Sequence, residues 1–595
     1  MLNDSSTTPA AAEGAAGSLR GSLNYEPQVL SFGTSGRRGE VVHLTQFEVY
    51  INASAELEYL LSRPQAEGGI VRGEEFYFAN DLRPSSTRLD PQFGGRGEMA
   101  QAICCAIADA GLQPVYLGAL PTPALTCCAL ERRRGSMMIT GSHIPFERNG
   151  YKTNTAHGEL LKKDEAPINA LVGRVRERLY TQPAAQSLFN PAGMFKSGHL
   201  ELPPVLEAAR TSYLRRYLDF FAGRTLRGRR LLVFQHSAVG RDLLVDLLRQ
   251  FGAEVVVDGR SETFVPIDTE NVEEALLVKM QEMVDRAAAQ HGPIDAVVST
   301  DGDSDRPLIL GVDPAPSACS GSSARVRFFG GDLVGMVVAQ YLGADSVVVP
   351  ISCNDAIDRG ALRGVLEPKT RIGSPFVIAG MERARLKGRR RICGWEANGG
   401  FLTGSDLERD GRILRALPTR DAMLPILATL FAAGERDSSL SQLFDNLPKR
   451  FSKAALLKRF PRPVSLAIIQ RCSPVDPAVT DILFGSGDPQ TLGADGRPVV
   501  PSADSKAGCV SIHAFLADVF SPAAGFGEIE RINYTDGVRL CFSNGDVAHV
   551  RPSGNADELR IYAVAYTQAR AEAITRFGVA EPGGLLRQLE QSVRR

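Results

Sequence analysis

Apolar and polar positions alternate along the chain in a pattern that predicts repeated strand–helix–strand units. Two copies are complete, each a strand, a helix, a glycine and a second strand: 75–79, 99–109, Gly111 and 114–117 in the first, and 230–234, 241–250, Gly252 and 254–257 in the second. A third copy is less complete, with a strand at 346–350 and a helix after Asn354. Such units predict α/β domains with mixed, mostly parallel sheets.

The C-terminal part follows a different pattern. Two alternating segments, 537–542 and 546–550, are joined at Asn544-Gly545, which is a hairpin turn signal. A strand at 559–566 follows, and a helix from about Gln568 closes the chain. This order predicts a smaller α+β domain. The stretch from about 461 to 527 is rich in Pro, Gly, Ser and Asp, which favours a linker with surface insertions.

The length of 595 residues is too great for one core and predicts about three to five domains. We therefore expect three related α/β domains followed by one α+β domain. The expected limits are a flexible N-terminal extension at 1–25, α/β domains at 26–200, 201–325 and 326–450, a linker with insertions at 451–527, and the α+β domain at 528–595.

Charge and composition narrow the possible partners. The formal net charge of -1 argues against nucleic acid or an anionic membrane, because both favour a basic excess. No apolar run approaches the ~20 residues that span a bilayer. The N-terminal residues lack the basic start and apolar block of an export signal. We therefore expect a cytoplasmic protein whose ten cysteines are reduced thiols.

One loop carries three aspartates at alternate positions. Asp301, Asp303 and Asp305 directly follow an apolar strand, and three hard oxygen ligands in one tight loop suit Mg²⁺. An EF-hand calcium loop would need Gly and Glu where Arg306 and Val312 stand. A solvated acidic turn also fits this pattern. Arg306 beside the carboxylates is suited to binding phosphate through its guanidinium fork.

A second loop, 137–145, places Ser142 after another apolar segment. A serine that carries a phosphoryl group needs a cation beside it, so the serine loop and the aspartate loop together indicate phosphoryl transfer. Lys152 is a candidate general acid/base or charge clamp for that step. The serine lacks the Gly-x-Ser-x-Gly elbow of many hydrolases.

Three further loops contain side chains that suit anions and sugar hydroxyls. The segment 32–39 combines glycines, hydroxyls and Arg38, and 551–555 offers Arg551, Ser553, Gly554 and Asn555 as a phosphate nest. In 394–401, Glu396 and Asn398 stand among glycines and can bind vicinal hydroxyls. Each loop is also compatible with an ordinary turn or core connection.

Taken in order, these loops resemble the α-D-phosphohexomutase superfamily, over about 30 to 565. Residues 140–145 resemble its phosphoserine loop, 301–306 its metal loop, Glu396 and Asn398 its sugar-binding loop, 551–555 its phosphate-binding loop, and 81–86 a segment of its first domain. The subgroup it looks most like is the bacterial phosphomannomutases.

The resemblance implies four domains around a central cleft and a phosphosugar substrate. Ser142 would carry the phosphoryl group, and Mg²⁺ would be held by the three aspartates and a phosphate oxygen on Ser142. Mannose 6-phosphate and mannose 1-phosphate would interconvert through a hexose 1,6-bisphosphate. Arg38 and Lys152 match acid/base or charge-stabilising residues, and Arg551, Ser553, Gly554 and Asn555 the phosphate grip. Such an enzyme is expected as a monomer or homodimer.

The sequence departs from the usual family pattern at four positions. Gly141 stands for Ala and Ile144 for Asn in the serine loop, and Ser374 and Gly400 stand where many members have a basic residue or histidine. The last two positions help to set sugar preference, so glucose and amino-sugar phosphates stay open as substrates. The residues are also compatible with an inactive sugar-phosphate-binding homologue and with a metal-dependent phosphatase.

Overall fold

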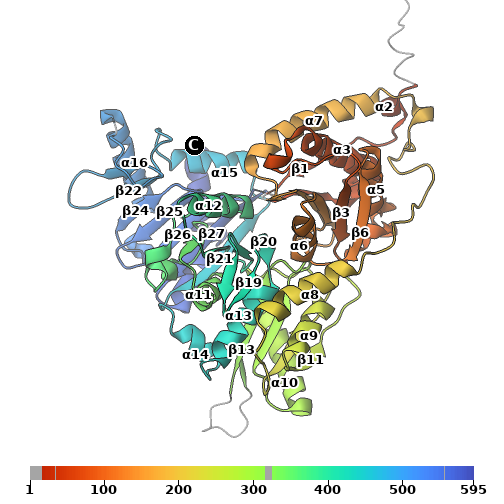
Figure 1. The fold of residues 1–595 in the computed structure, drawn as a ribbon. Coiled ribbons are helices and arrows are strands. Elements are labelled where there is room, and N and C mark those ends of the chain that lie inside the picture. Colours follow the sequence, from red (N-terminus) through yellow and green to blue (C-terminus); the bar gives the residue numbers. More distant parts are fainter. Residues whose placement is uncertain (1–16, 34, 315–323, 501, 555–556, 595) are drawn as a thin grey trace, which may run out of the picture.

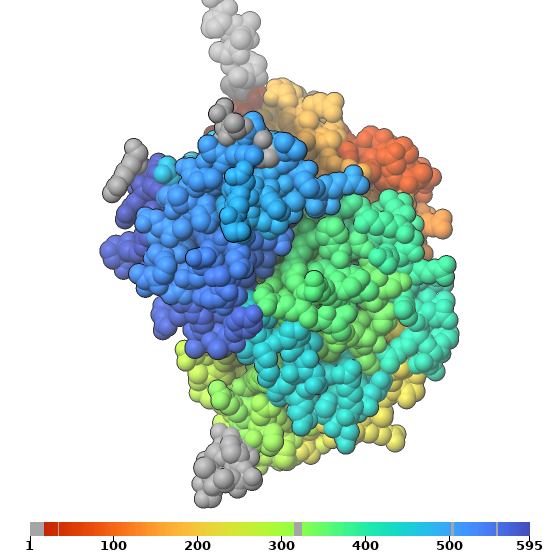
Figure 2. Space-filling model, turned by 90° about the vertical axis from the view of Figure 1, so that its left-hand side faces the viewer, coloured from red at the N-terminus to blue at the C-terminus, as the bar shows by residue number. Residues whose placement is uncertain are grey.

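The computed structural model describes residues 17–33, 35–314, 324–500, 502–554 and 557–594. Figure 1 shows the N-terminal and C-terminal units as the two upper parts of the molecule, with the second and third units below and between them. Figure 2, turned by 90°, shows the blue C-terminal residues packed against the green and cyan residues of the third unit.

The first unit is a seven-stranded mixed sheet in the order β1-β2-β8-β7-β3-β6, with β9 paired to β8. Its strands are Ser31–Phe32 (β1), Arg37–Glu40 (β2), Glu75–Asn80 (β3), Gln113–Ala119 (β6), Ser136–Ile139 (β7), Arg148–Thr155 (β8) and Gly158–Glu159 (β9). Its main helices are Gln46–Ser62 (α3), Met99–Asp109 (α5), Thr122–Arg132 (α6) and Lys162–Tyr180 (α7).

The second unit has five strands in the order β11-β10-β12-β13-β14. These are Arg230–Phe234 (β10), Glu254–Asp258 (β11), Ala296–Thr300 (β12), Pro307–Asp313 (β13) and Arg325–Phe328 (β14), with helices Ala208–Phe220 (α8), Arg241–Gln250 (α9) and Glu274–His291 (α10). The two complete strand–helix–strand predictions are confirmed, and Gly111 and Gly252 have the left-handed φ values (78° and 89°) that end a helix.

The third unit corrects one prediction. After β15 (Ser346–Val348), Asn354 begins only a four-residue 3-10 helix, and the α-helix of this crossover is α12 (Ser374–Leu386). Its other elements are Gly331–Tyr341 (α11), Ile392–Trp395 (β16), Phe401–Thr403 (β17), Leu407–Arg409 (β18), Arg412–Leu414 (β19), Leu417–Asp421 (β20), Met423–Gly434 (α13) and Leu440–Asp445 (α14). The sheet order is β15-β16-β17-β20.

The sheets are mixed, as predicted, but they are not mostly parallel. Among the assigned strands of the described residues, β3 pairs parallel with β6 and β7, β10 with β11 and β12, and β15 with β16. The other pairs in these three sheets are antiparallel, and several of them, such as β7–β8, β12–β13 and β16–β17, are consecutive strands joined without a crossover helix.

The prediction of a linker at 451–527 is wrong. This stretch contributes Phe451–Lys458 (β21), Asp481–Leu483 (β22) and Gln490–Leu492 (β23) to the C-terminal sheet, with helices Arg462–Arg471 (α15) and Ala503–Val519 (α16). The sheet order is β21-β27-β26-β25-β24-β22-β23. Its Pro and Gly residues fall largely in the short connections, where they end elements without preventing them.

The rest of the C-terminal unit agrees with the predicted hairpin and strand. The strands are Ile529–Asn533 (β24), Val538–Phe542 (β25), Val547–Pro552 (β26) and Glu558–Ala565 (β27). Gly545 has a φ of 82°, which fits the predicted turn. Two helices close the chain instead of one, Gln568–Gly578 (α17) and Leu585–Arg594 (α18).

Most of the predicted N-terminal extension, 1–16, lies outside the described residues. The described end of this extension is not free, because Leu19 in the short helix Leu19–Ser22 (α2) is buried in the core of the first unit. No helix in the described ranges is both long and apolar enough to cross a membrane. The exact limits of the domains stay a prediction.

The apolar core is divided unequally among the units. One cluster joins side chains of the first three units, with Tyr77 from β3, Val233 from β10 and Trp395 from β16 among its members. The C-terminal sheet and its helices α15 to α18 enclose a separate cluster that contains Leu540 and Ile561. The C-terminal unit therefore has its own core, and hydrogen bonds such as that from the Ile372 N–H to Asp536 join it to the third unit.

Candidate active site

Ser142 lies in a tight turn at the carboxyl end of β7. Its backbone is left-handed, with φ of 55°, which is uncommon for a residue with a side chain. The Thr140 hydroxyl accepts a hydrogen bond from the Ser142 N–H at 2.7 Å and donates to Asp81 Oδ2 at 2.7 Å. Because Asp81 directly follows β3, the neighbouring strand fixes the turn that presents Ser142.

Arg83 holds the same loop from the other side. Its buried guanidinium donates to four carbonyls of that loop, those of Ser142, Ile144, Pro145 and Arg148. It also lies 3.7 Å from the ring centroid of Phe264 in the second unit. A Cβ at Gly141 would stand 2.6 Å from Arg83 Cζ, so this arrangement requires the glycine that replaces the usual alanine.

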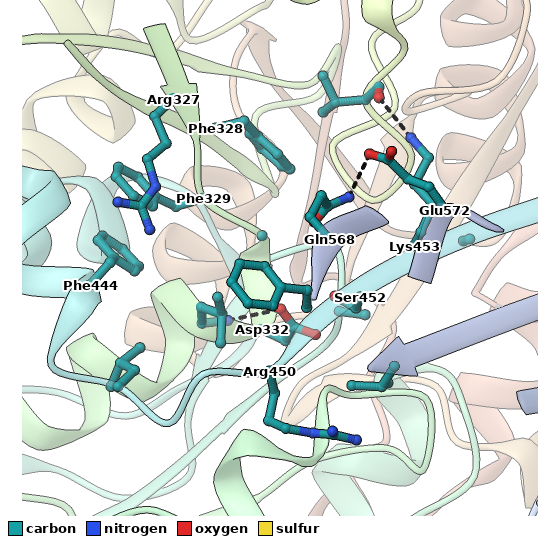
Figure 3. A pocket seen from close by; sticks show the side chains of 18 of the residues that line it. Arg327, Phe328, Phe329, Asp332, Phe444, Arg450, Ser452, Lys453, Gln568 and Glu572 are labelled. Atoms are coloured by element: carbon teal, nitrogen blue, oxygen red, sulfur yellow. Dashed lines mark hydrogen bonds between the residues drawn. The ribbon is translucent and has the colours of Figure 1, made fainter. Parts of the chain in front are cut away.

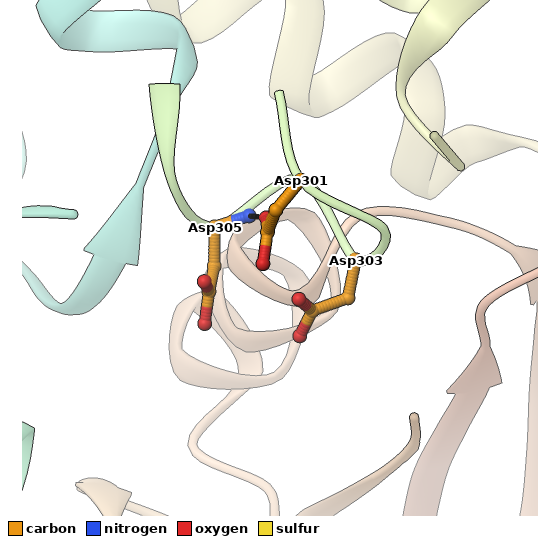
Figure 4. Close-up of side chains that lie close together, drawn as sticks. All are labelled: Asp301, Asp303 and Asp305. Atoms are coloured by element: carbon orange, nitrogen blue, oxygen red, sulfur yellow. Dashed lines mark hydrogen bonds between the residues drawn. The ribbon is translucent and has the colours of Figure 1, made fainter. Parts of the chain in front are cut away.

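The aspartate loop of the second unit faces this serine. Ser142 Oγ donates to Asp301 Oδ2 at 2.7 Å, and one carboxylate oxygen from each of Asp301, Asp303 and Asp305 lies within 4.8 Å of the others (Figure 4). Asp303 Oδ1 and Asp305 Oδ1 are buried and have no hydrogen-bond partner among the described residues. Buried carboxylate oxygens that lack partners fit a hard divalent cation, so these side chains could hold a metal.

Charge within the loop is unevenly distributed. Burial, followed by the charges of Asp303 and Asp305, raises the pKa of Asp301 well above its usual range. Burial also opposes ionisation of Asp305, but Arg420 and Lys152 outweigh it and hold the pKa of that carboxyl well below its usual range. Asp305 therefore keeps its negative charge because cations of other units face it.

Lys152 and Arg38 stand on adjacent strands of the first sheet, and Lys152 reaches the aspartate loop. Lys152 is opposite Met138 in the β7–β8 ladder, and its Nζ donates to Asp303 Oδ2 at 2.7 Å and Asp305 Oδ2 at 2.8 Å. Arg38, on β2, donates to the Tyr151 carbonyl. Burial lowers the pKa of Arg38 to about 10, so this guanidinium is still charged at neutral pH.

The third unit supplies a residue that no sequence motif marks. Arg420, on β20, donates from Nη1 to Glu396 Oε2 at 2.8 Å and from Nη2 and Nε to Asp305 Oδ2 at 2.7 and 3.0 Å. Glu396 is thereby tied to the aspartate loop. Asn398 Oδ1 instead accepts from the Gly400 N–H within its own loop.

The C-terminal loop is anchored toward the third unit. Arg551 Nε donates to Asp536 Oδ1 at 3.0 Å, and Asp536 Oδ2 accepts from the Ile372 N–H at 2.9 Å. Ser553 is buried, and Gly554 accepts a hydrogen bond from Arg462 through its carbonyl. Asn555 lies outside the described residues. No hydrogen bond or ion pair in the described part of the chain joins Arg551 to the Ser142 group.

Ser374 makes a contact between units. Its hydroxyl donates to Glu159 Oε2 at 2.7 Å, and the Thr419 hydroxyl donates to Glu159 Oε1 at the same distance. Glu159 belongs to β9 of the first unit, so Ser374 helps to join the first and third units.

A cavity of about 680 Å³ lies where the second, third and C-terminal units meet (Figure 3). Its wall includes Phe329 after β14, Asp332 of α11 and Lys453 of β21. Neither Ser142 nor the aspartate loop is among its described lining residues, although Ala397 of the loop that carries Glu396 is. The cavity thus adjoins the sugar-loop segment and is separate from the serine–aspartate group.

Of the predicted site residues, Ser142, Lys152, the three aspartates, Arg306 and Glu396 come together. Arg306 Nε is 3.5 Å from Asp305 Oδ1. Sequence reasoning missed Arg420, Glu159 and Thr122, whose hydroxyl donates to Asp303 at 2.6 Å. It included Arg83 only as part of the segment 81–86, without a role for its side chain.

Comparisons with known proteins agree with this arrangement. Residues 29–178 match the model of the phosphoglucomutase/phosphomannomutase α/β/α domain I, 330–451 that of domain III, and 503–577 that of the C-terminal domain. These segments span more than half of the chain. Fold, loops and family models together define an enzyme: the chain belongs to the α-D-phosphohexomutase family of isomerases.

Curated relatives match this chain in sequence over most of its length. A phosphomannomutase of Salmonella muenchen is 34% identical over 550 residues, covering 91% of this chain and 93% of that protein. A phosphomannomutase of Sinorhizobium fredii is also 34% identical, covering 92% and 98%. A phosphoglucosamine mutase of Xanthobacter autotrophicus is 26% identical over 431 residues, covering 70% and 82%.

Solved structures share the fold. A putative phosphomannomutase of Thermus thermophilus superposes with a TM-score of 0.58 at 19% identity, covering 96% of this chain and all of that one. A phosphoglucomutase/phosphomannomutase family protein of Burkholderia thailandensis gives a TM-score of 0.59 at 16% identity, covering 94% and 97%.

Proposed function

We propose that this phosphohexomutase interconverts mannose 6-phosphate and mannose 1-phosphate through a phosphoserine at Ser142. The observation that carries the proposal is the contact between Ser142 Oγ and the aspartate loop of another unit, with Lys152 bridging two of the aspartates. The choice of mannose rests on the two phosphomannomutases that are 34% identical over nearly the whole chain.

Asp301, Asp303, Asp305 and a phosphate oxygen on Ser142 would hold Mg²⁺, which when bound offsets charge on the transferring group. In the forward step, the bond between phosphorus and Ser142 Oγ breaks and a bond to the free sugar hydroxyl forms. The hydroxyl proton passes to water, and the Lys152 ammonium, which pairs with Asp303 and Asp305, stabilises charge beside the transferring group. Arg38 and Arg306 stabilise the negative charge that spreads over the phosphoryl oxygens.

The product of that step is a hexose 1,6-bisphosphate. After it turns over in the site, its other phosphate returns to Ser142 and the remaining monophosphate leaves. Glu396 and Asn398 bind sugar hydroxyls in both orientations. The loop with Arg551, Ser553, Gly554 and Asn555 grips the phosphate that is not reacting, which lets one site serve both ends of the sugar.

The test is a coupled assay with purified protein, Mg²⁺ and a trace of glucose 1,6-bisphosphate. We expect mannose 1-phosphate to turn over and a mass gain of one phosphate that disappears in Ser142→Ala. Good turnover of another hexose 1-phosphate with none of mannose 1-phosphate would reject the choice of sugar. No phosphorylation of Ser142 would reject the mechanism.

Amino-sugar phosphates form the second candidate substrate class. The phosphoglucosamine mutase of Xanthobacter autotrophicus matches 70% of the chain, and Gly400 lacks the histidine side chain of many members. Glucosamine and N-acetylglucosamine 1-phosphates belong in the same assay, and a higher kcat/KM for either than for mannose 1-phosphate would select an amino sugar as the substrate.

A further inference from the structure

Arg420 occupies the space in which a side chain at position 400 would lie. An added Cβ at Gly400 would stand 2.4 Å from Arg420 Cδ and 2.7 Å from its Cγ. Position 400 and Arg420 therefore compete for one volume at the end of the sugar loop. In this chain the glycine leaves that volume to a guanidinium from β20.

The guanidinium is placed between the two loops that the substrate has to connect. Its Nη1 contacts Glu396 of the sugar loop, and its Nη2 and Nε contact Asp305 of the aspartate loop. The reacting oxygen of a phosphosugar lies at the junction of the phosphoryl group and the ring. A sugar held at Glu396 with its phosphoryl group at the aspartate loop would bring that oxygen beside Arg420.

Arg420 also has hydrogen-bonding capacity to spare. A guanidinium has five N–H donors, and the contacts to Glu396 and Asp305 use three of them within the described residues. The side chain is 5% exposed, so water can satisfy little of the remainder. Buried donors without partners are costly unless an acceptor arrives, and the oxygens of a phosphosugar are suitable acceptors.

We propose that Arg420 is a catalytic residue that donates to the oxygen joining the transferring phosphoryl group to the sugar, in place of a side chain at position 400. An arginine keeps its proton, so this role is charge stabilisation and not acid/base chemistry. The inference rests on the proposed phosphoryl transfer but not on which hexose is preferred.

The first experiment measures transfer in a single turnover. Enzyme phosphorylated at Ser142 is mixed with the hexose 1-phosphate that the wild type uses best, and loss of the phosphate mass is followed. We expect Arg420→Lys to slow this step by about 100-fold, because one ammonium cannot reproduce the fork. The matched control Arg415→Gln, an exposed residue just before β20, should transfer at the wild-type rate.

The second experiment separates contact with substrate from a structural effect. In a Ser142→Ala background with EDTA, calorimetry measures binding of the same hexose 1-phosphate without turnover. We expect Arg420→Lys to weaken binding by about 10-fold, which is the loss of one charge-assisted hydrogen bond. Gly400→Ala should cause the same loss while keeping the arginine, because its methyl group displaces Arg420.

Wild-type transfer and binding in both Arg420→Lys and Gly400→Ala would overturn the inference and leave the mutase function intact. A wild type that neither phosphorylates Ser142 nor turns over any hexose phosphate would instead overturn the proposed function. If Arg420→Lys loses its cooperative thermal unfolding, the Gly400→Ala result alone decides whether Arg420 contacts the substrate. Partial recovery of the transfer rate of Arg420→Ala on addition of guanidinium ion would support the inference directly.

Discussion

At the scale of single residues, two arginine side chains occupy the space that side chains at two glycine positions would need. Arg83 takes the volume next to Gly141, and Arg420 takes the volume next to Gly400. Each glycine is a departure from the usual family pattern, and each is explained by an arginine from another segment. The other altered loop position, Ile144, has no explanation in the structure.

Gly141→Ala should damage the phosphoserine loop. The new methyl group meets an Arg83 guanidinium that four loop carbonyls hold in place, so the cost should be about 1–3 kcal/mol of overpacking. We expect a lower melting temperature and slower phosphorylation of Ser142, followed by calorimetry and intact mass. Gly173→Ala is the control: it lies within α7 with no atom near the added Cβ, and there alanine should stabilise the helix. Equal behaviour of the two variants would contradict this role for Arg83.

At the scale of elements, the sequence predicted those strands and helices whose positions are specified by local apolar periodicity. The strands and helices of the two complete units, and the C-terminal hairpin, were found at their predicted positions because apolar spacing and glycine stops specify them locally. The segment 451–527 was misinterpreted because its short strands are stabilised by pairing with β24 and β27, far along the chain.

The distinction between local and long-range signals also explains which site residues could be predicted from the sequence. Ser142, Lys152 and the aspartates stand in recognisable loops after apolar strands. Arg420 stands on β20 in a segment without a motif, and the third sheet brings it to Asp305. Long-range pairing of this kind leaves no signal in one sequence.

Arg450→Met should loosen the connection between the third and C-terminal units. Arg450 forms a two-point pair with Asp355 and donates to the Gly545 carbonyl in the β25–β26 turn. Removing it breaks a buried ion pair and leaves Asp355 only the more exposed Arg359 as a partner, so the loss should be at most about 3–5 kcal/mol, the cost of an uncompensated buried charge. We expect urea denaturation at a lower midpoint and a KM for the phosphosugar that rises more than kcat falls, because Arg551 belongs to the displaced unit.

Arg359→Gln is the matched control for that change. Arg359 also pairs with Asp355, but its side chain is 42% exposed, so its loss should cost under about 1 kcal/mol. If both variants lowered stability equally, burial would not be the reason for the effect of Arg450.

At the scale of the whole molecule, the site is assembled by cations that cross between units. Lys152 of the first unit and Arg420 of the third both contact Asp305 of the second, and Glu159 joins the first unit to Ser374 and Thr419 of the third. The proposed chemistry at Ser142 therefore depends on the relative positions of three units, and the C-terminal unit carries the loop that we propose binds the second phosphate.

The division of the core predicts unfolding in two steps. One apolar cluster joins the first three units, which also have smaller clusters of their own, whereas the main cluster of the C-terminal unit includes no other unit. The chain's single tryptophan, Trp395, is buried in the shared cluster, so its fluorescence reports that part alone. In urea, we expect circular dichroism to begin its change before tryptophan fluorescence does. Coincident curves from the two probes would indicate one cooperative unit instead.

The separate C-terminal core also has a consequence for how the enzyme is made. During synthesis the first three units leave the ribosome before the C-terminal strands, and domains generally fold in that order. Ser142, the aspartates and Arg420 can therefore meet while the phosphate-binding loop has not yet been translated. If the proposed roles hold, a nascent chain at that stage has the groups for phosphoryl transfer but not the loop that grips the far phosphate, so catalysis has to wait until the last sheet has closed.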